Sequence, residues 1–326
     1  MRIAVGVDVG AVSTNLVAID EQGQVKCKLY LRTRGNPIAV VQEGLLQLEG
    51  QLSPNCEVIA CGTTGSGRQL TAHLVGADCV KNEITAHAIA ALATNPKVQT
   101  VLEIGGQDSK IIILRDGVVV DFAMNTVCAA GTGSFLDRQA ARLGIDISEL
   151  GPLALAASQG TRIAGRCAVF AESDMVHKQQ MGHPTEEIVR GLCDALVRNY
   201  LSNVGKGKEI RQSIVFQGGV AANVGIRQAF QEALQMEIEI PEHYNVMGAI
   251  GSAILAERLV KQTGAATHFR GFKIATADCH ARMRDCSGCA NHCEVVEFSI
   301  DKNSIACWGD RCGKWSNRQT SGVANN

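Results

Sequence analysis

The sequence has few charged and few aromatic residues. Only 19% of its 326 residues are Asp, Glu, Lys or Arg, 4% are Phe, Trp or Tyr, and the formal net charge is −1 at pH 7. Proteins that capture nucleic acid or an anionic membrane by electrostatics usually carry an excess of positive charge, so this composition disfavours both partner classes. We expect the partners to be small molecules or another protein, with no nucleic acid and no membrane.

Long apolar runs are missing as well. No segment approaches the roughly 20 consecutive apolar residues that a membrane-spanning helix needs. The opening residues, MRIAVGVDVG, lack the basic segment and long apolar stretch of a secretory signal peptide. Both absences predict a cytoplasmic protein.

Cysteine and glycine, by contrast, are abundant, with 13 and 34 residues. Thiols stay reduced in the cytoplasm, so this many cysteines favour metal binding or redox chemistry over a disulfide framework. Five cysteines stand alone in the sequence and are expected to be inert, small apolar side chains. These five are Cys27, Cys56, Cys61, Cys79 and Cys193.

The chain repeats one order of predicted elements, in which an apolar strand, a glycine turn and two further strands precede a helix. The first copy has strands at 2–9, 16–20 and 25–32 with a helix at 37–52, and the second has strands at 98–104, 110–114 and 118–124 with a helix at 134–143. The repetition predicts an α/β fold of two similar halves, residues 1–97 and 98–262, around a cleft. The final helix, 248–261, is expected to pack back on the first half, and a cysteine-rich tail follows at 263–326.

The first glycine turn follows the first predicted strand. Asp8 ends that strand, and the next residues are Gly10, Ala11, Val12, Ser13 and Thr14. A tight turn of this kind presents backbone N–H groups to phosphate oxygens, and a carboxylate beside it can hold Mg²⁺ through water. A simple β-hairpin would give the same local pattern.

A second glycine turn, Gly105-Gly106-Gln107-Asp108-Ser109, occupies the corresponding place in the second half. Two opposed turns, each with an aspartate, can clamp the β- and γ-phosphates with their metal. A third cluster, Gly218-Gly219-Val220-Ala221-Ala222-Asn223, lies between a strand and a helix, where glycine lets a flat ring approach the backbone. The order of the three clusters predicts an ATP site.

With these motifs the chain resembles the actin, sugar kinase and Hsp70 superfamily of ATPases. It resembles more closely the ATP-dependent activators of 2-hydroxyacyl-CoA dehydratases, the ATPase subunits of benzoyl-CoA reductases and the related reductases of double-cubane cluster proteins. The segments that carry the resemblance are GVDVGAVST, TGSGR at 64–68, NEITAHA at 82–88, IGGQDSKII, MNTVCAAGTGSFLD, CAVFAESDMV, FQGGVAANVGIR and MGAIGSAILA. The resemblance covers roughly residues 1–262 and implies an actin-like ATPase fold of two duplicated ribonuclease-H-like domains.

The resemblance also implies roles in ATP hydrolysis. Asp8 is expected to organise Mg²⁺, while Gln107 and Asp108 position the attacking water and the γ-phosphate. Asp108 is the preferred base, although the sequence alone does not separate it from Asp8. Asn15 departs from the family, which often has lysine at this position. The expected nucleotide contacts are Gly10, Ala11, Val12, Ser13, Thr14, Asn15, Gly105, Gly106, Gly131, Thr132, Gly133, Gly218, Gly219, Val220 and Asn223.

Cys128 and Cys167 each stand at a turn that precedes a predicted helix. The resemblance implies that they ligate one four-iron four-sulfur (4Fe-4S) cluster shared across a homodimer, which would make the protein oxygen-sensitive. Such a cluster needs four thiolates, and a twofold axis turns two per chain into four. The helix N-termini would also stabilise an anionic cluster.

The activity that follows from the resemblance is that of an ATP-dependent iron–sulfur reductase, or activase. ATP hydrolysis would change the domain arrangement and pass a low-potential electron to a partner iron–sulfur enzyme, such as a 2-hydroxyacyl-CoA dehydratase-like or double-cubane cluster protein. Ferredoxin or flavodoxin is the expected electron donor. The alternative is a small-molecule kinase of the same superfamily with structural metal only, but phosphoryl transfer does not require Cys128 and Cys167.

Four further polar residues have open roles. Glu83 and His87 lie one helical turn apart and could reach the cleft together, whereas a structural role for the histidine is the alternative. Glu172 and Asp174 follow Cys167 within a predicted helix, and we expect them on a solvated or dimer-facing surface, without a role in proton transfer.

The tail concentrates six cysteines: Cys279, Cys286, Cys289, Cys293, Cys307 and Cys312. Cys286-x-x-Cys289-x-x-x-Cys293 has the close spacing of metal ligands, and Cys312 is the expected fourth. Zinc and an iron–sulfur cluster both fit, and a zinc site could also include His280 or His292. We favour a cluster, because the rest of the chain is expected to do redox chemistry and a second cluster would offer an entry point for electrons.

Overall fold

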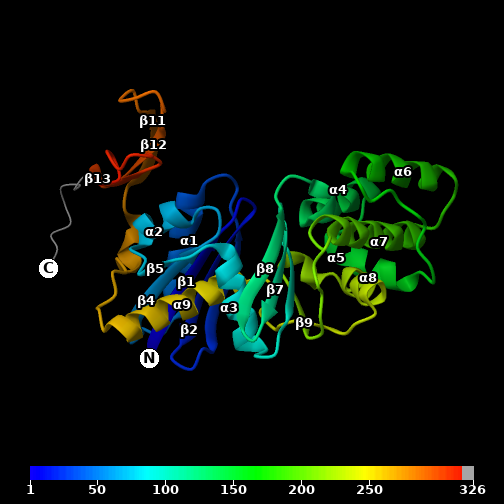
Figure 1. Cartoon of the computed structure of the whole chain (residues 1–326), viewed down its shortest axis with the longest axis horizontal. Coiled ribbons are helices and arrows are strands. Elements are labelled where there is room, and N and C mark those ends of the chain that lie inside the picture. Colours follow the sequence, from blue (N-terminus) through cyan, green and yellow to red (C-terminus); the bar gives the residue numbers. More distant parts are fainter. Residues whose placement is uncertain (318–326) are drawn as a thin grey trace. The chain divides into compact units, whose positions relative to one another are not determined.

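The computed structural model describes residues 1–317, and they form two compact units (Figure 1). The first unit contains residues 1–86 and the described residues from 248 on, and the second contains His87–Met247. In the described part of the chain, no helix is both long and apolar enough to cross a membrane.

The first unit is built on a five-stranded sheet with the order β3-β2-β1-β4-β5. Strands β1 to β3 are antiparallel neighbours, whereas β4 and β5 run parallel to β1. Their bounds are β1 Arg2–Val9, β2 Ser13–Asp20, β3 Val25–Arg32, β4 Glu57–Thr64 and β5 Cys79–Val80. The helices of this unit are α1 Pro37–Gln51, α2 Arg68–Val75 and α9 Met247–Thr263, whereas α3 Glu83–Thr94 begins in the first unit and has most of its residues in the second.

Helix α9 lies directly on this sheet. A Cβ added to Gly6 of β1 would lie 1.9 Å from the carbonyl oxygen of Ala249, and one added to Gly62 of β4 would lie 2.1 Å from that of Ser252. Glycine on the strands and small residues on the helix therefore allow backbone contact. Helix α9, the last helix before the tail, therefore belongs to the first unit.

The second unit repeats the same sheet, with the order β10-β9-β6-β7-β8. Its strands are β6 Thr100–Ile104, β7 Ser109–Arg115, β8 Val118–Asn125, β9 Ile214–Gln217 and β10 Ile238–Glu239. Its helices are α4 Gly133–Leu143, α5 Ile147–Ala156, α6 Ala168–Gln180, α7 Thr185–Asn203 and α8 Val224–Leu234, with short 3₁₀ helices η1 Ala129–Gly131 and η2 Gly219–Ala222. The predicted α/β fold with two matching halves is confirmed.

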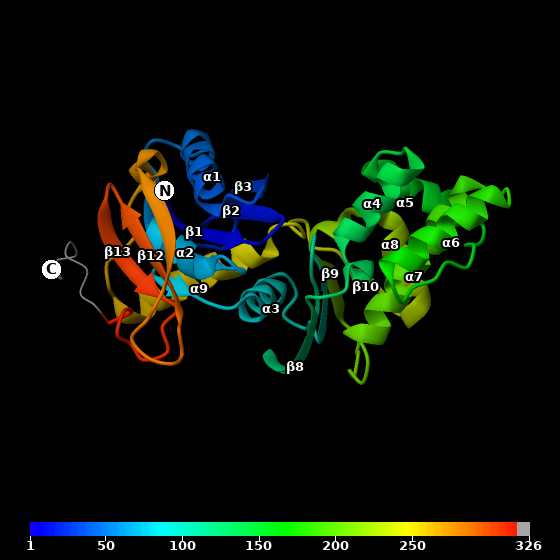
Figure 2. The ribbon, with the colours of Figure 1, turned by 90° about the horizontal axis from the view of Figure 1, so that it is seen from above.

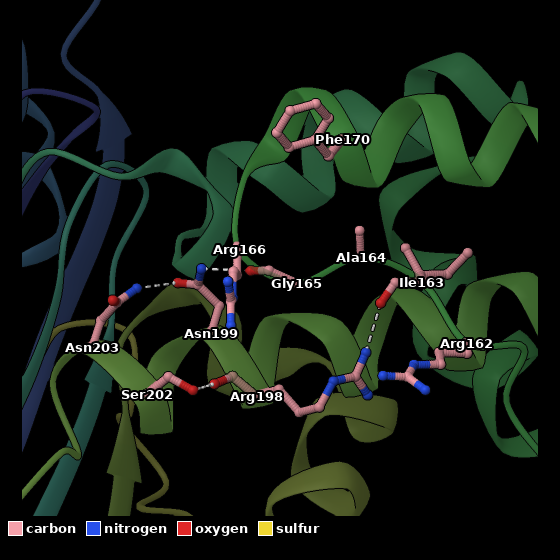
Figure 3. Close-up of a pocket in the computed structure, with 10 residues that line it drawn as sticks. All are labelled: Arg162, Ile163, Ala164, Gly165, Arg166, Phe170, Arg198, Asn199, Ser202 and Asn203. Carbon is pink, nitrogen blue, oxygen red and sulfur yellow. Dashed lines mark hydrogen bonds between the residues drawn. The ribbon is translucent and has the colours of Figure 1, made fainter.

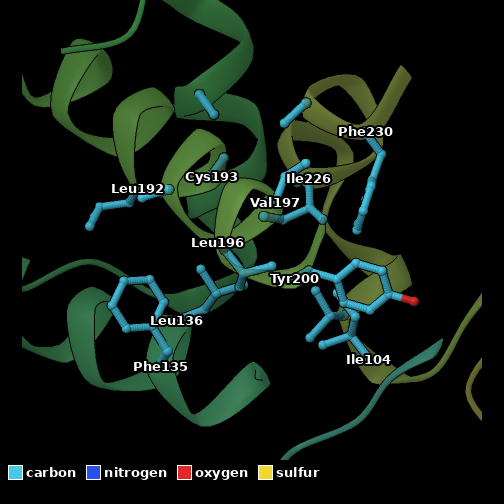
Figure 4. Packing of buried hydrophobic residues seen from close by; sticks show 14 of the residues in the cluster. Ile104, Phe135, Leu136, Leu192, Cys193, Leu196, Val197, Tyr200, Ile226 and Phe230 are labelled. Atoms are coloured by element: carbon cyan, nitrogen blue, oxygen red, sulfur yellow. The ribbon is translucent and has the colours of Figure 1, made fainter. Parts of the chain in front are cut away.

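The core of the second unit is centred on α7, whose inward face is buried along most of its length (Figure 4). The Tyr200 ring meets the Phe230 ring edge-on at 5.2 Å, and Phe230 meets Phe216 of β9 at the same distance. The Tyr200 hydroxyl donates a hydrogen bond of 2.6 Å to the carbonyl of Lys110. Ring packing therefore holds α7 against α8, and a buried hydrogen bond anchors it to β7.

The described part of the tail packs onto the first unit. It comprises the 3₁₀ helix η3 Phe272–Thr276 and an antiparallel meander of β11 Cys279–Asp285, β12 Glu294–Ile300 and β13 Asn303–Trp308. Phe298 is fully buried in the first unit's core, and Trp308 stacks on His73 of α2 at 5.1 Å. Figure 2 shows β12 beside α2, with which it is in contact.

Candidate functional site

The first glycine turn links β1 to β2 and is pinned by a threonine. The Gly10 N–H donates to the Ser13 carbonyl at 2.9 Å, and the Thr33 hydroxyl donates to the Gly10 carbonyl at 2.8 Å. The Thr33 hydroxyl also lies 3.0 Å from that of Thr14. The exposed backbone at Ala11 is thus held in one conformation, as phosphate recognition by N–H groups requires.

A second turn, residues 64–68, packs against the end of β1. Gly65 has a φ of +86°, and a Cβ there would lie 2.5 Å from both Asp8 Oδ1 and the Val9 carbonyl oxygen. The Gly67 N–H donates to that carbonyl at 2.9 Å. The TGSGR segment, for which no separate role was predicted, therefore forms the wall beside Asp8.

In the second unit, Asp108 is held by a buried lysine. Lys110 Nζ lies 2.9 Å from Asp108 Oδ2 and 2.9 Å from Glu103 Oε2. The side chains of Lys110 and Glu103 are 2% and 5% exposed, whereas that of Asp108 is 32% exposed. Burying a charge without a partner is costly, so the lysine stabilises Glu103 and orients Asp108 toward solvent. Neither Lys110 nor Glu103 was predicted from the sequence as a site residue.

The predicted glycine clusters of the second unit meet around this group. The N–H groups of Gly133 and Ser134 donate to the carbonyls of Gly105 and Gly106, at 2.9 and 2.8 Å. Gly218 has a φ of +90°, and a Cβ there would lie 2.7 Å from Glu103 Oε1. The structure thus brings together the turns at 105–106, 131–133 and 218–219.

Several predicted nucleotide contacts also have structural roles. Thr132 is fully buried and its hydroxyl donates to the Ala129 carbonyl at 2.8 Å. Asn223 caps α8, since its side-chain oxygen accepts the Ile226 N–H at 3.1 Å. Asn15 is buried on β2 opposite Asp8, whereas Gln107 is exposed. Nucleotide contacts by these residues stay predictions.

His87 is buried, with its Nδ1 2.8 Å from the Gln217 amide nitrogen. Burial, and secondarily the charge of Lys110, lowers the pKa of this imidazole to about 3. The ring is therefore neutral at pH 7 and packed in the second unit, which favours the structural role. Glu83, one turn earlier, is partly exposed.

Cys128 is fixed by Asn125 at the end of β8. The Asn125 side chain accepts the Cys128 N–H at 2.9 Å and donates to the Cys128 carbonyl at 2.8 Å. The Cys128 Sγ lies 3.9 Å from the carbonyl oxygen of Arg166, the residue before Cys167. The two predicted cysteines are therefore on adjacent loops, and both are partly exposed.

Asn199 of α7 holds these two loops together. It is 4% exposed, and its Nδ2 donates to the Gly165 carbonyl at 2.6 Å. A Cβ added to Gly131, in the Cys128 loop, would lie 2.7 Å from Asn199 Oδ1. The position of Asn199 in a long amphipathic helix did not predict that it would hold the two cysteine loops together.

Each cysteine precedes a helix, and an acidic residue ties the two helices together. Glu172 of α6 pairs with both Arg138 and Arg142 of α4, at 2.9 Å in each case. Asp174 accepts the Ala164 N–H at 2.9 Å. Glu172 is 14% exposed, so within one chain it holds the cysteine helices together rather than lying on a solvated surface.

A groove of about 770 Å³ opens beside Cys167 (Figure 3). Three exposed arginines line it, Arg162, Arg166 and Arg198, together with Phe170. The Arg198 guanidinium donates to the Ile163 carbonyl at 2.7 Å. No Asp or Glu lines this groove, so it is a basic surface next to the cysteine pair.

The predicted tail cysteines lie in two loops. Cys286, Cys289 and Cys293 are in or at the ends of the loop between β11 and β12, and Cys312 follows β13. Within residues 1–317, no three or more Cys, His, Asp or Glu side chains lie close enough together to hold a metal ion.

The duplicated sheets and their glycine turns define an ATPase of the actin-like class. Residues 5–256 match the BadF/BadG/BcrA/BcrD ATPase family, and the chain belongs to this family. The match ends before the tail.

Two relatives are activators of dehydratases. The chain is 30% identical over 254 residues to the (R)-2-hydroxyglutaryl-CoA dehydratase activating ATPase of Acidaminococcus fermentans, covering 77% of this chain and 95% of that protein. It is 34% identical over 194 residues to the 2-hydroxyisocaproyl-CoA dehydratase activator of Clostridioides difficile, covering 59% and 71%. The solved activator of the 2-hydroxyisocaproyl-CoA dehydratase from Clostridium difficile with bound ADPNP has 29% identity and a TM-score of 0.73, covering 80% of this chain and 97% of that one.

Replacing Gly65 by alanine should weaken nucleotide binding at least tenfold. The new methyl group would collide with Asp8 and the Val9 carbonyl, in addition to the strain of a positive φ. Titration with a fluorescent ATP analogue measures the effect. Gly23→Ala is the matched control, because Gly23 has a φ of +79° but no atom within 4 Å of an added Cβ. Equal affinities in the two variants would contradict the assignment of this turn.

His87 should make the fold sensitive to acid. Its pKa is lower in the folded than in the unfolded chain, so its contribution to stability is present above about pH 6.5 and is lost as the pH falls toward 3. Between pH 6.5 and 5 this group should remove about 1.5 kcal/mol of unfolding free energy. Urea unfolding at both pH values should show a smaller loss in His87→Gln. An equal loss in both proteins would show that His87 already titrates normally.

Proposed function

We propose that this protein is an ATP-dependent iron–sulfur reductase that couples ATP hydrolysis to delivery of a low-potential electron to a partner iron–sulfur enzyme. The observation that carries the proposal is the adjacency of Cys128 and Cys167 in the same unit as the Asp108 turn. The dehydratase activators among the relatives support it.

The cysteine pair fits half of a four-thiolate site. Two partly exposed thiols lie on adjacent loops, each at the start of a helical segment, so a second copy of the chain would complete a tetrad around a 4Fe-4S cluster. Val127 and Val169, which lie within two residues of these cysteines in the sequence, are 95% and 66% exposed, as expected for a surface that a homodimer covers. A bound cluster would supply one-electron transfer at low potential.

The glycine turns fit a nucleotide with Mg²⁺. On this proposal Asp8 holds the metal through water, the backbone at Gly10–Ser13 binds phosphate oxygens, and Gln107 with Asp108 orients the attacking water. Lys110 holds one oxygen of Asp108, so the carboxylate needs no reorientation as charge develops.

One strand pair would carry the coupling between the two sites. Ser109, next to Asp108, is paired in register with Asn125, which holds Cys128. The carbonyls of the Gly105-Gly106 turn also anchor the start of α4, the helix that follows Cys128. A shift of this turn on ATP hydrolysis would therefore reach the cysteine loop at both of its ends.

The partners follow from charge and chemistry. The arginine groove beside Cys167 supports an acidic electron donor such as ferredoxin or flavodoxin, because complementary charge accelerates association. The acceptor is proposed to be a dehydratase-like or double-cubane cluster protein.

Changing Cys128 to serine tests the function. Anaerobically purified protein should contain about four irons and four sulfides per dimer from this site, and Cys128→Ser should lose them with ATP-driven electron delivery while still binding nucleotide. Iron analysis, native mass and reduction of an acceptor measure these outcomes. Cys56→Ser, a partly exposed cysteine elsewhere, should behave as the unmodified protein.

Electron delivery that survives in Cys128→Ser would refute the shared-cluster model. A colourless protein that phosphorylates a sugar or an acid would instead identify the kinase alternative.

A further inference from the structure

We propose that the tail holds its own thiolate-bound metal centre, with Cys286, Cys289, Cys293 and Cys312 as ligands and either Zn²⁺ or a small iron–sulfur cluster as occupant. The site lies outside the region that the family match covers and goes beyond the proposed reductase function. It is assigned from the geometry of the tail sheet.

The register of the meander brings the four cysteines to one end of the sheet. Asp285 at the end of β11 pairs with Glu294 at the start of β12, and Val296 pairs with Trp308 at the end of β13. A Cβ added to Gly309 would lie 2.3 Å from the Glu294 carbonyl oxygen, so the chain after β13 leaves the sheet beside the β11–β12 loop. Cys312 therefore enters the same region as the other three.

The register also places the other two tail cysteines outside the two loops. Cys279 pairs with Ile300 at the opposite end of the sheet, roughly 20 Å along β11 from Asp285 at ~3.3 Å per residue. Burial raises the pKa of Cys279, which keeps it a neutral thiol. Cys307 lies within β13, opposite Glu297, and not in either loop.

The two cysteine loops already pack against each other. The Trp315 indole N–H donates to the Cys286 sulfur at 3.3 Å, and the Cys286 N–H donates to the Cys293 carbonyl at 2.8 Å. A Cβ on Gly288 would lie 3.0 Å from Lys314 Nζ and 3.4 Å from the Cys286 sulfur, so Lys314 of the second loop lies close to the first. N–H donors and a nearby ammonium stabilise a thiolate, the form that binds metal.

Cations and carboxylates both lie beside the loops, since Arg284 is paired with Glu297 and Asp310 accepts the backbone N–H of Trp315. Arg284 lies over the Trp315 ring at 5.4 Å, and Lys314 is next to Cys286. Four thiolates around a divalent ion carry a net charge of about −2, and the Lys314 ammonium beside Cys286 would offset part of it.

Closure of the site requires two side chains to turn inward. Cys289 and Cys312 are exposed, and in the described residues the thiols do not yet converge within ligand distance. The loops have almost no apolar core of their own, since the buried apolar residues of the meander, Val295 and Phe298, lie on β12. Metal binding would supply the loop ordering that packing does not.

Metal analysis of the full-length protein in a Cys128→Ser/Cys167→Ser background tests the site separately from the proposed function. We expect one stoichiometric centre per chain, retained on adding Cys279→Ser and lost on adding Cys312→Ser. Zinc without sulfide identifies a single ion, and iron with acid-labile sulfide identifies a cluster. Absence of stoichiometric metal in this background, or equal loss in the two added variants, would overturn the assignment.

Alkylation of the unmodified protein gives a readout that does not depend on variants. Cys289 and Cys312 are exposed and should alkylate quickly when metal-free, so we expect at least tenfold slower labelling in the purified protein, reversed by a chelator. Rapid labelling of both thiols in protein as purified would contradict a metal centre.

Discussion

The site in the second unit depends on the ion pairs that Lys110 makes with Glu103 and Asp108. The Lys110 ammonium group is nearly fully buried. It neutralises Glu103 beneath the Gly218 turn and orients Asp108 at the surface. The Lys110 carbonyl accepts the Tyr200 hydroxyl, so the same residue anchors α7. Removing one partner of a buried ion pair leaves an uncompensated charge, which typically lowers the free energy of unfolding by about 3–5 kcal/mol. Because Lys110 contacts the turn, the strand and the helix, it stabilises all three together.

Only a few contacts connect the Lys110 cluster to the cysteine pair. Asp108 precedes β7, Asn125 ends β8, and the pairing of Ser109 with Asn125 sets the position of the Cys128 loop. Asn199 and Glu172 then hold the Cys167 loop and helix against it. The Gly105–Asp108 turn and the cysteine pair thus share one small, well-packed scaffold, as the proposed coupling of ATP hydrolysis to electron transfer requires.

Local patterns in the sequence predicted much of this fold. Apolar strands and glycine turns are contiguous signals, so most strands of both sheets and the helices that follow them could be placed to within a few residues. The two-residue strands β5 and β10 carry no periodicity and were missed. Helix α5 was missed although Asp146 and Glu149 form a capping box at its start.

The positioning residues of the site were harder to predict. Lys110 meets its partners across a turn, and Asn199 contacts loops that are more than 30 residues away in the sequence. Glu172 looked like surface charge because its two arginines lie on another helix. The expectation that isolated cysteines are inert fits Cys193, whose pKa burial raises to about 12. The contacts of Lys110, Asn199 and Glu172 depend on tertiary packing, which the spacing of residues along the chain does not reveal.

Hydrogen exchange with and without an ATP analogue and Mg²⁺ shows whether the Gly105–Asp108 turn controls the cysteine loop. If it does, nucleotide changes the exchange of backbone amides in the turn and also at residues 125–134, around Cys128. Protection of the glycine turns with no change at residues 125–134 would contradict this control of the loop.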